Sequence, residues 1–340
     1  MFLSVTPLPL QLRHPFRIAH GSSTVRHNAL IELNEGLGEA ALPPYYPTRF
    51  EDVKAYVESI SELLREAVIR EPLELVAVLK SLPDGPTPAM AAVDMALHDL
   101  WGKQLGLPLY QLLGLTERHI PPSSYALPIA ESLEAHEVQL GPVLHFPFLK
   151  LKLGSGDPAF DLAITRKTRE LYSGHLCVDV NGGWSIDQAA VTIPALKELD
   201  LLFVEQPIRP TDNDEWHLLK RLLPPRSIPL IADESIQGAD DLFELAGAVQ
   251  GINIKLAKCG GIRAAQNLIS LARTLDMSVM LGCMIESSVA LTAAAHLGAL
   301  VDYLDLDGQL HLANDPFSGL NFESGTITLP ESPGLGITKA

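Results

Sequence analysis

The sequence predicts an α/β fold in which a (β/α)8 barrel follows an N-terminal α+β unit. Short apolar runs recur every 22 to 28 residues between residues 124 and 305, with helical segments between them. One strand plus one crossover helix fits that spacing, and such crossovers make neighbouring strands parallel. The later runs also end in polar or charged residues, as expected where barrel strands open on one functional face. The first third of the chain lacks this rhythm, so we expect a separate unit there.

The composition indicates a folded protein. Hydrophobic residues make up 47% of the 340 residues and charged residues 19%, which excludes a disordered chain. No apolar run reaches the roughly 18 residues of a membrane span, and we expect no export signal. Three scattered cysteines are too few for a disulfide framework or a zinc knuckle. We therefore expect a cytoplasmic protein with reduced thiols and no membrane partner.

The net charge of −16 argues against nucleic acid as a ligand, because a phosphate backbone would be repelled. An acidic surplus fits either a solubilising surface or carboxylates that hold a cation. Composition leaves both open, and the positions of the acids must decide.

The N-terminal unit is predicted to combine short strands with helices over roughly 115 residues. Residues 2–33 have strand-like alternation, interrupted by a polar stretch at 16–24 that we expect to be a loop. A turn is expected at 34–38. Three helices should follow, at residues 51–70, 87–104 and 108–113.

The barrel strands are predicted from eight apolar runs. Seven are clear from their spacing, and the eighth lies 28 residues before Lys152. The runs are 124–127, 148–152, 176–179, 201–205, 228–233, 252–255, 278–283 and 301–305.

Three acids end three consecutive strands: Asp179, Glu205 and Asp233. Adjacent strands lie about 4.8 Å apart, and carboxylates at that spacing repel one another unless a cation lies among them. Oxygen-only ligation favours Mg²⁺ before Mn²⁺. The alternative is that each acid caps the helix that follows it.

Three lysines are expected at the same barrel mouth. Lys150 and Lys152 alternate on one strand and so point the same way, whereas Lys255 lies about halfway round the barrel. Two lysines that face each other across a cavity can remove a proton from one face of a carbon and return one to the other. The alternative is that they are simple charge partners of the carboxylates.

The motifs around these residues resemble those of the enolase superfamily, in its muconate-lactonising-enzyme subgroup. The resemblance spans nearly the whole chain, and as a set the motifs are specific. The matching segments are Lys150-Leu151-Lys152, Asp179 to Trp184, Glu205-Gln206-Pro207, Ala232 to Ser235, Asn253 to Gly261, Met284 to Ser287 and Pro333 to Ile337.

The resemblance implies a capping domain over a modified barrel. We expect the α+β capping domain at residues 1–118, the catalytic barrel at 119–315, and a C-terminal tail at 316–340 that returns to complete the capping domain. It also implies one metal ion, Mg²⁺ or Mn²⁺, on the three acids, with Lys152 and Lys255 as the acid/base pair. Further copies of the chain are the expected protein partners, in a homo-oligomer.

Asp305-Leu306-Asp307 resembles the D-x-D motif of dipeptide epimerases similar to L-Ala-D/L-Glu epimerase. In that family the acids receive the free ammonium group of a dipeptide, a group with three donors that suits two carboxylates. The alternative is a surface turn, since Asp307-Gly308 is a common turn dipeptide.

The resemblance implies a Mg²⁺-dependent dipeptide epimerase that inverts the C-terminal residue through a metal-stabilised enediolate. It also implies substrate contacts for a wider set of residues, with Lys150 on the substrate carboxylate. That set is Tyr125, Lys150, Asn181, Cys283, Ile285, Asp305 and Asp307.

One departure bears on specificity: Gly21 stands where the alanyl-glutamate enzymes carry an arginine for the glutamate side chain. No acidic residue occurs between Phe16 and Asn28 either, so we expect an uncharged pocket for dipeptides of alanine and a hydrophobic residue. A contrary arrangement would bring His20, Arg26 or Glu51 into that pocket.

Other activities remain open on the same scaffold. They are N-acyl amino acid racemisation, o-succinylbenzoate synthesis and muconate cycloisomerisation, whose substrates lack an ammonium group at this position. A catalytically silent metal-binding homologue is a further alternative, which the intact acids and lysines disfavour.

Overall fold

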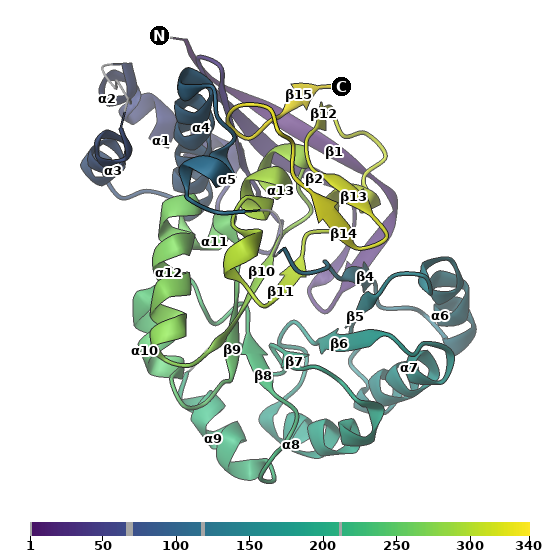
Figure 1. Ribbon diagram of the computed structural model, residues 1–340. Helices are drawn as coiled ribbons and strands as arrows, with labels where there is room; N and C mark the ends of the chain where they lie inside the picture. Colours follow the sequence, from purple (N-terminus) through teal and green to yellow (C-terminus); the bar gives the residue numbers. More distant parts are fainter. Residues whose placement is uncertain (1, 66–70, 117–119, 211–212) are drawn as a thin grey trace.

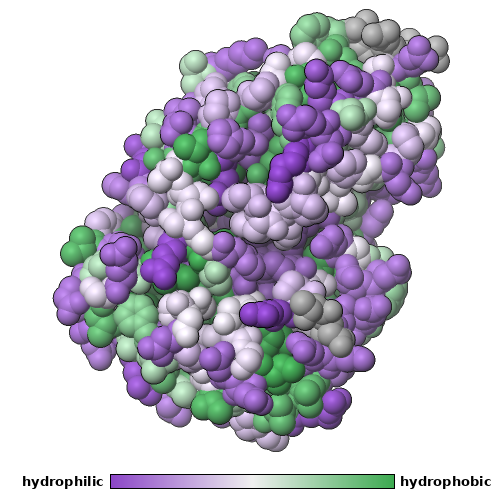
Figure 2. Space-filling view, turned by 180° about the vertical axis from the view of Figure 1, so that it is seen from behind, coloured by the Kyte–Doolittle hydropathy of each residue, from purple (hydrophilic) through white to green (hydrophobic). Residues whose placement is uncertain are grey.

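The computed structural model describes residues 2–65, 71–116, 120–210 and 213–340. Figure 1 shows a barrel with its helices in the lower part and a smaller lobe above it, where both ends of the chain lie. Within the described residues, no helix is both long and apolar enough to cross a membrane. Hydrophilic residues predominate on the face shown in Figure 2.

Eight parallel strands form the barrel sheet and follow one another in chain order. The first and last strands meet where Ser124 N donates a hydrogen bond of 2.8 Å to Leu304 O, which brings the sheet nearly to closure. The predicted barrel is therefore confirmed, run by run. The strands are β4 (Tyr125–Leu127), β5 (Phe148–Lys152), β6 (His175–Asp179), β7 (Val204–Glu205), β8 (Leu230–Ala232), β9 (Gly251–Ile254), β10 (Ser278–Gly282) and β11 (Tyr303–Asp305).

Amphipathic helices cover the outside of the barrel. In α12, the buried residues Ile262, Ala265, Leu268, Ile269 and Ala272 recur at helical spacing and so form one apolar stripe. The helices between strands are α6 (Leu133–Leu140), α7 (Pro158–Leu171), α8 (Ile186–Ala195), α9 (Asp214–Leu222), α10 (Ala239–Leu245), α11 (Leu256–Cys259), α12 (Ile262–Thr274) and α13 (Ser288–Ala295).

The upper lobe contains a three-stranded antiparallel sheet packed on helix α4. Gly38 permits that packing, because a Cβ there would meet Ala92 O at 1.8 Å. The elements are β1 (Leu3–Ile18), β2 (Gly21–Leu33), β3 (Gly36–Ala40), α1 (Phe50–Ser59), α2 (Ser61–Arg65), α3 (Pro72–Ser81), α4 (Thr87–Leu105) and α5 (Leu109–Leu112).

Three expectations for this lobe were wrong. The turn expected at 34–38 covers only Asn34 and Glu35, because the chain pairs with β2 again from Gly36 and forms β3. The stretch 16–24 is not a loop, because β1 and β2 continue to a two-residue turn at Ala19 and His20. Helix α3 was not predicted; Leu75 is its only buried residue, so its apolar periodicity is weak. The end of the helix predicted at 51–70 lies outside the described residues.

The C-terminal tail packs back against the upper lobe. Leu109 N donates to Gly334 O at 2.8 Å, and Leu335 N donates to Asp99 Oδ1 at 2.7 Å. The expected boundary at 118 lies outside the described residues, and the division at 315 stays a prediction. The tail strands are β12 (Phe317–Ser318), β13 (Asn321–Glu323), β14 (Thr326–Thr328) and β15 (Thr338–Lys339).

Candidate active site

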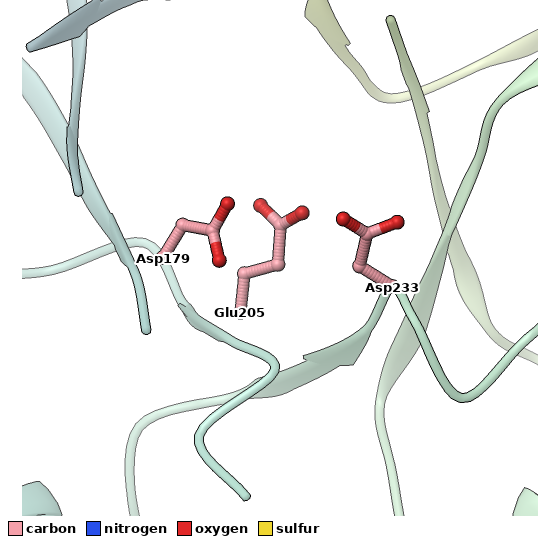
Figure 3. A group of neighbouring side chains, drawn as sticks. All are labelled: Asp179, Glu205 and Asp233. Carbon is pink, nitrogen blue, oxygen red and sulfur yellow. The ribbon is translucent and has the colours of Figure 1, made fainter. Parts of the chain in front are cut away.

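Three carboxylates meet at the carboxyl ends of neighbouring strands. Asp179 ends β6, Glu205 ends β7 and Asp233 directly follows β8. The parallel register pairs Asp179 with Glu205, so their side chains leave the sheet at one level. All three are buried, and one oxygen from each lies within 4.8 Å of the others. Figure 3 shows the three carboxylates side by side; we call them the acidic triad.

The acidic triad fits a divalent cation. Burial and the neighbouring carboxylates of Asp179 and Asp233 raise the pKa of Glu205 to about 8. Three buried acids at this separation therefore disfavour full ionisation, and a bound cation would relieve that cost. An all-oxygen donor set suits a hard ion such as Mg²⁺.

Lys152 and Lys255 approach the acidic triad from two sides. Lys152 ends β5 and Lys255 directly follows β9, with three strands between them in the sheet. Lys152 Nζ lies 2.6 Å from Asp179 Oδ2, and Lys255 Nζ lies 2.7 Å from Asp233 Oδ2. Both lysines line the same cavity. This arrangement gives that cavity a proton donor or acceptor on each side.

The pairing with acids keeps both lysines protonated. Burial acts to lower the pKa of Lys152, but the neighbouring carboxylates, Asp179 foremost, leave that pKa raised above its usual value. Burial likewise works against the charge of Lys255, and Asp233 raises its pKa well above the usual value.

Asp305 and Asp307 line the same cavity from the end of β11. Ser124 Oγ donates to Asp305 Oδ1 at 2.5 Å, and Ala126 N donates to Asp307 Oδ2 at 2.6 Å. His311 Nε2 also lies 3.0 Å from Asp307 Oδ2. The two acids are thus held in place at the cavity wall, and they are not a surface turn.

Lys150 lies deeper than the other lysines and is fully buried. Its Nζ is 2.6 Å from Glu205 Oε2, 2.8 Å from Asp305 Oδ2 and 3.4 Å from Asp179 Oδ2. It is not among the residues that line the cavity. Burial would raise the pKa of Asp305, but Lys150 counters this, and the pKa falls to about 2.

The other residues expected to contact substrate are divided between two hollows. Asn181, Cys283 and Ile285 line the cavity with the lysines. Asn181 Nδ2 donates to Glu234 Oε1 at 3.0 Å. Tyr125 instead borders the neighbouring groove, where its ring packs on His311 at 5.3 Å between centroids.

The far end of the β1–β2 hairpin covers the cavity. In Figure 1 this purple hairpin runs down from the upper lobe to the barrel near β4. His20 at its turn lies 3.8 Å from Glu234, which raises the pKa of His20. Asn28 Nδ2 donates to Ile285 O at 3.1 Å and fastens β2 to the barrel.

Arg26 and Glu234 also line this cavity. The sequence offered Arg26 only in the contrary arrangement, beside His20 and Glu51, and it gave Glu234 no direct role. Arg26 and Asn28 are buried on one face of β2 while His27 between them is exposed. This alternation places the Arg26 side chain on the face of β2 that turns toward the barrel.

Family models match both parts of the chain. Residues 3–114 match the mandelate racemase / muconate lactonizing enzyme N-terminal domain, and residues 130–339 match the enolase C-terminal domain-like model. The chain belongs to the enolase superfamily. It is an isomerase, and its likeness to dipeptide epimerases confirms the resemblance found in the sequence.

Three similar proteins have a named activity or a bound ligand. The chain is 36% identical over 349 residues to the L-Ala-D/L-Glu epimerase of Bacteroides thetaiotaomicron, covering 100% of this chain and 88% of that one. It is 41% identical over 253 residues to the hydrophobic dipeptide epimerase of Roseobacter litoralis, covering 73% and 72%. The dipeptide epimerase of Enterococcus faecalis V583, solved with Mg and L-Leu-L-Tyr, has a TM-score of 0.85 at 30% identity, covering 99% and 98%.

Proposed function

We propose that this superfamily member is a Mg²⁺-dependent dipeptide epimerase that inverts the α-carbon of the C-terminal residue. The observation that carries the proposal is a single cavity lined by Lys152, Lys255, Asp305 and Asp307 beside the acidic triad. Two bases on opposite sides suit inversion, and two carboxylates suit a free ammonium group. The names of similar proteins support this substrate class.

The chain's own residues orient the substrate before any proton moves. Asp305 and Asp307 accept hydrogen bonds from the substrate ammonium group, which leaves the α-carbon between Lys152 and Lys255. The hairpin covers the cavity and limits the access of water. A bound Mg²⁺, or Mn²⁺ in its place, would hold the substrate carboxylate and stabilise the negative charge that develops as the α-proton leaves.

The two lysines then carry out a 1,1-proton transfer. One neutral lysine takes the α-proton from one face, and the other, as an ammonium, returns a proton to the opposite face. Coordination would engage Asp179 and Asp233, so the attraction that raises both lysine pKa values would weaken. The lysine pKa values would thus move toward the range that a general base needs.

The role of Lys150 follows from its three acid partners. It offsets the charge of Glu205 and Asp179 and joins them to Asp305. Direct contact with the substrate carboxylate, as the resemblance implies, stays a prediction.

A dipeptide library in D₂O tests the proposal. Solvent deuterium should enter the C-terminal α-position, and the second diastereomer should appear, each detected by ¹H NMR and chiral chromatography. Lack of exchange with every dipeptide would leave the silent metal-binding homologue as the better interpretation. Faster turnover of N-acetylated substrates would instead favour an N-acyl amino acid racemase.

The remaining alternatives make different products. An o-succinylbenzoate synthase would dehydrate its substrate and a muconate cycloisomerase would open or close a lactone, so neither would give a dipeptide diastereomer. The Asp305–Asp307 pair favours the epimerase over both.

The sequence predicts alanine followed by a hydrophobic residue as the preferred substrate. Phe16 and Ile18 line the cavity as that preference requires. Arg26, on the same wall, does not fit it. A cytoplasmic location and a homo-oligomeric state likewise stay predictions.

A further inference from the structure

Arg26 is a buried cation at the cavity, and it has no acidic partner among the described residues. It lies on β2 with 6% of its surface exposed. Its guanidinium donates to Ser23 Oγ, and no carboxylate of the described residues forms an ion pair with it. A guanidinium has five N–H donors. Most of that hydrogen-bonding capacity is therefore unused by the described part of the protein.

This isolation distinguishes Arg26 from the other cations of the cavity. Lys152 and Lys255 each lie within 2.7 Å of a carboxylate oxygen of the acidic triad. Burial also lowers the pKa of Arg26, with only the nearby Tyr45 acting in the other direction. Charged groups are rarely buried without a partner, because desolvation is costly. An anionic occupant would supply the missing partner.

The position of Arg26 indicates which substrate group it faces. In the proposed function, the ammonium group occupies Asp305 and Asp307, and the substrate carboxylate lies at the acidic triad. The α-carbon lies between the two lysines. The one substituent of the α-carbon that is still unassigned is the side chain of the C-terminal residue. The one wall of the cavity that is still unassigned is the β1–β2 hairpin. Arg26 is the cation that lines that wall.

The hairpin holds Arg26 in this place. Asn28, two residues along on the same buried face, donates to Ile285 O at 3.1 Å and to Glu39 Oε1 at 2.7 Å. Ile285 itself lines the cavity. The strand segment that carries Arg26 is thus fixed to the barrel, which favours a preorganised contact.

We propose that Arg26 pairs with an acidic side chain of the substrate, so that the enzyme prefers dipeptides ending in glutamate or aspartate. This inference rests on the proposed function, and it replaces the expectation of an uncharged pocket. The arginine comes from β2, five residues after Gly21, the position where the sequence lacks one. Recognition of an acidic side chain therefore does not require an arginine at position 21.

The test compares isosteric substrates that differ in charge. We expect kcat/KM of the wild-type enzyme for Ala-Glu to exceed that for Ala-Gln by about 10- to 100-fold, as for a charge-assisted hydrogen bond. In Arg26→Met this ratio should fall to within a few-fold of one, because kcat/KM for Ala-Glu should fall much further than kcat/KM for Ala-Gln. Arg26→Lys should retain part of the preference, and Arg26→Glu should favour Ala-Lys over Ala-Glu.

Arg17→Met is the matched control. Arg17 is an exposed residue of the same hairpin and is not among the residues lining this cavity. Its replacement by methionine removes the same charge as Arg26→Met, but outside the cavity. It should leave the Ala-Glu to Ala-Gln ratio unchanged. An equal loss with both substrates in Arg26→Met would assign Arg26 a structural role and overturn the inference.

The substrate preference of the wild-type enzyme tests the inference even if every Arg26 variant misfolds. A preference for Ala-Leu or Ala-Gln over Ala-Glu would overturn this inference and leave the epimerase proposal standing. No α-proton exchange with any dipeptide would instead remove the proposed function on which the inference rests.

Discussion

Replacing Asp307 by asparagine isolates the charge that is proposed to bind the substrate ammonium. The substitution is nearly isosteric, and an asparagine oxygen can still accept the 2.6 Å hydrogen bond from Ala126 N. Local structure should therefore survive. The variant loses one negative charge at the cavity wall and little else.

The expected loss follows from the strength of a charge-assisted hydrogen bond. Such a bond to a desolvated ammonium contributes about 1.5–3 kcal/mol. At about 1.4 kcal/mol per factor of ten, kcat/KM for free dipeptides should fall about 10- to 150-fold. Asp305→Asn should show a similar loss and also unfold more easily, because Lys150 loses its partner at 2.8 Å.

The assay pairs each enzyme with Ala-Leu and N-acetyl-Ala-Leu. Acetylation removes the ammonium charge from the substrate, so the wild-type enzyme should lose activity on the acetylated dipeptide. With the acetylated dipeptide, kcat/KM of Asp307→Asn should be close to that of the wild-type enzyme. Acetylation has already removed the ammonium charge, so the substitution removes no further interaction. If the substitution instead lowers kcat/KM by the same factor for both substrates, Asp307 does not bind the ammonium group.

Three further predictions concern the bases, the metal and stability. Lys152→Ala and Lys255→Ala should each abolish epimerisation while allowing α-deuterium exchange of only one diastereomer; near-wild-type epimerisation in either would refute the two-base scheme. Chelation should abolish turnover and added Mg²⁺ restore it, whereas full activity of protein shown metal-free by elemental analysis would exclude the metal site. His296 is buried with its pKa lowered to about 4 by desolvation, so the unfolded chain binds its proton first as the pH falls. The free energy of unfolding should therefore decrease between about pH 6.5 and 4, by up to about 1.4 kcal/mol per pH unit. Chemical denaturation should show this slope flattened in His296→Gln, and an unchanged slope would count against the assignment.

The barrel and the grouping of charged residues at its mouth were predictable because strand ends are encoded locally. A parallel strand that ends in an acid brings that acid to the barrel mouth whatever lies elsewhere in the chain. The separation of Lys150 from Lys152 was not predictable. Both point the same way, but two residues along a strand is about 6.6 Å in depth. That difference buries Lys150 among three acids, whereas Lys152 reaches the cavity.

The sequence placed the segment from Phe16 to Asn28 at the pocket, but it did not predict which of its side chains line the cavity. His20 and Arg26 reach the site only because the hairpin crosses to the barrel, where Asn28 and Ile285 fasten it. Those contacts join residues more than 200 positions apart, so the sequence of the hairpin alone does not show that it meets the barrel. The polar composition of 16–24 suggested a loop, although the two strands pair there with each other.

In the proposed function, the β1–β2 hairpin carries residues that select the substrate, whereas the barrel carries the residues that move the proton. Between Phe16 and Ser23 the two strands of the hairpin pair with each other, past the irregularity in register that follows Gln11. Lys152, Lys255 and the acidic triad belong to the barrel instead. A hairpin tip can therefore change through mutation without disturbing the barrel that folds around the catalytic groups. Related enzymes with this arrangement can therefore differ in substrate preference while they catalyse the same reaction.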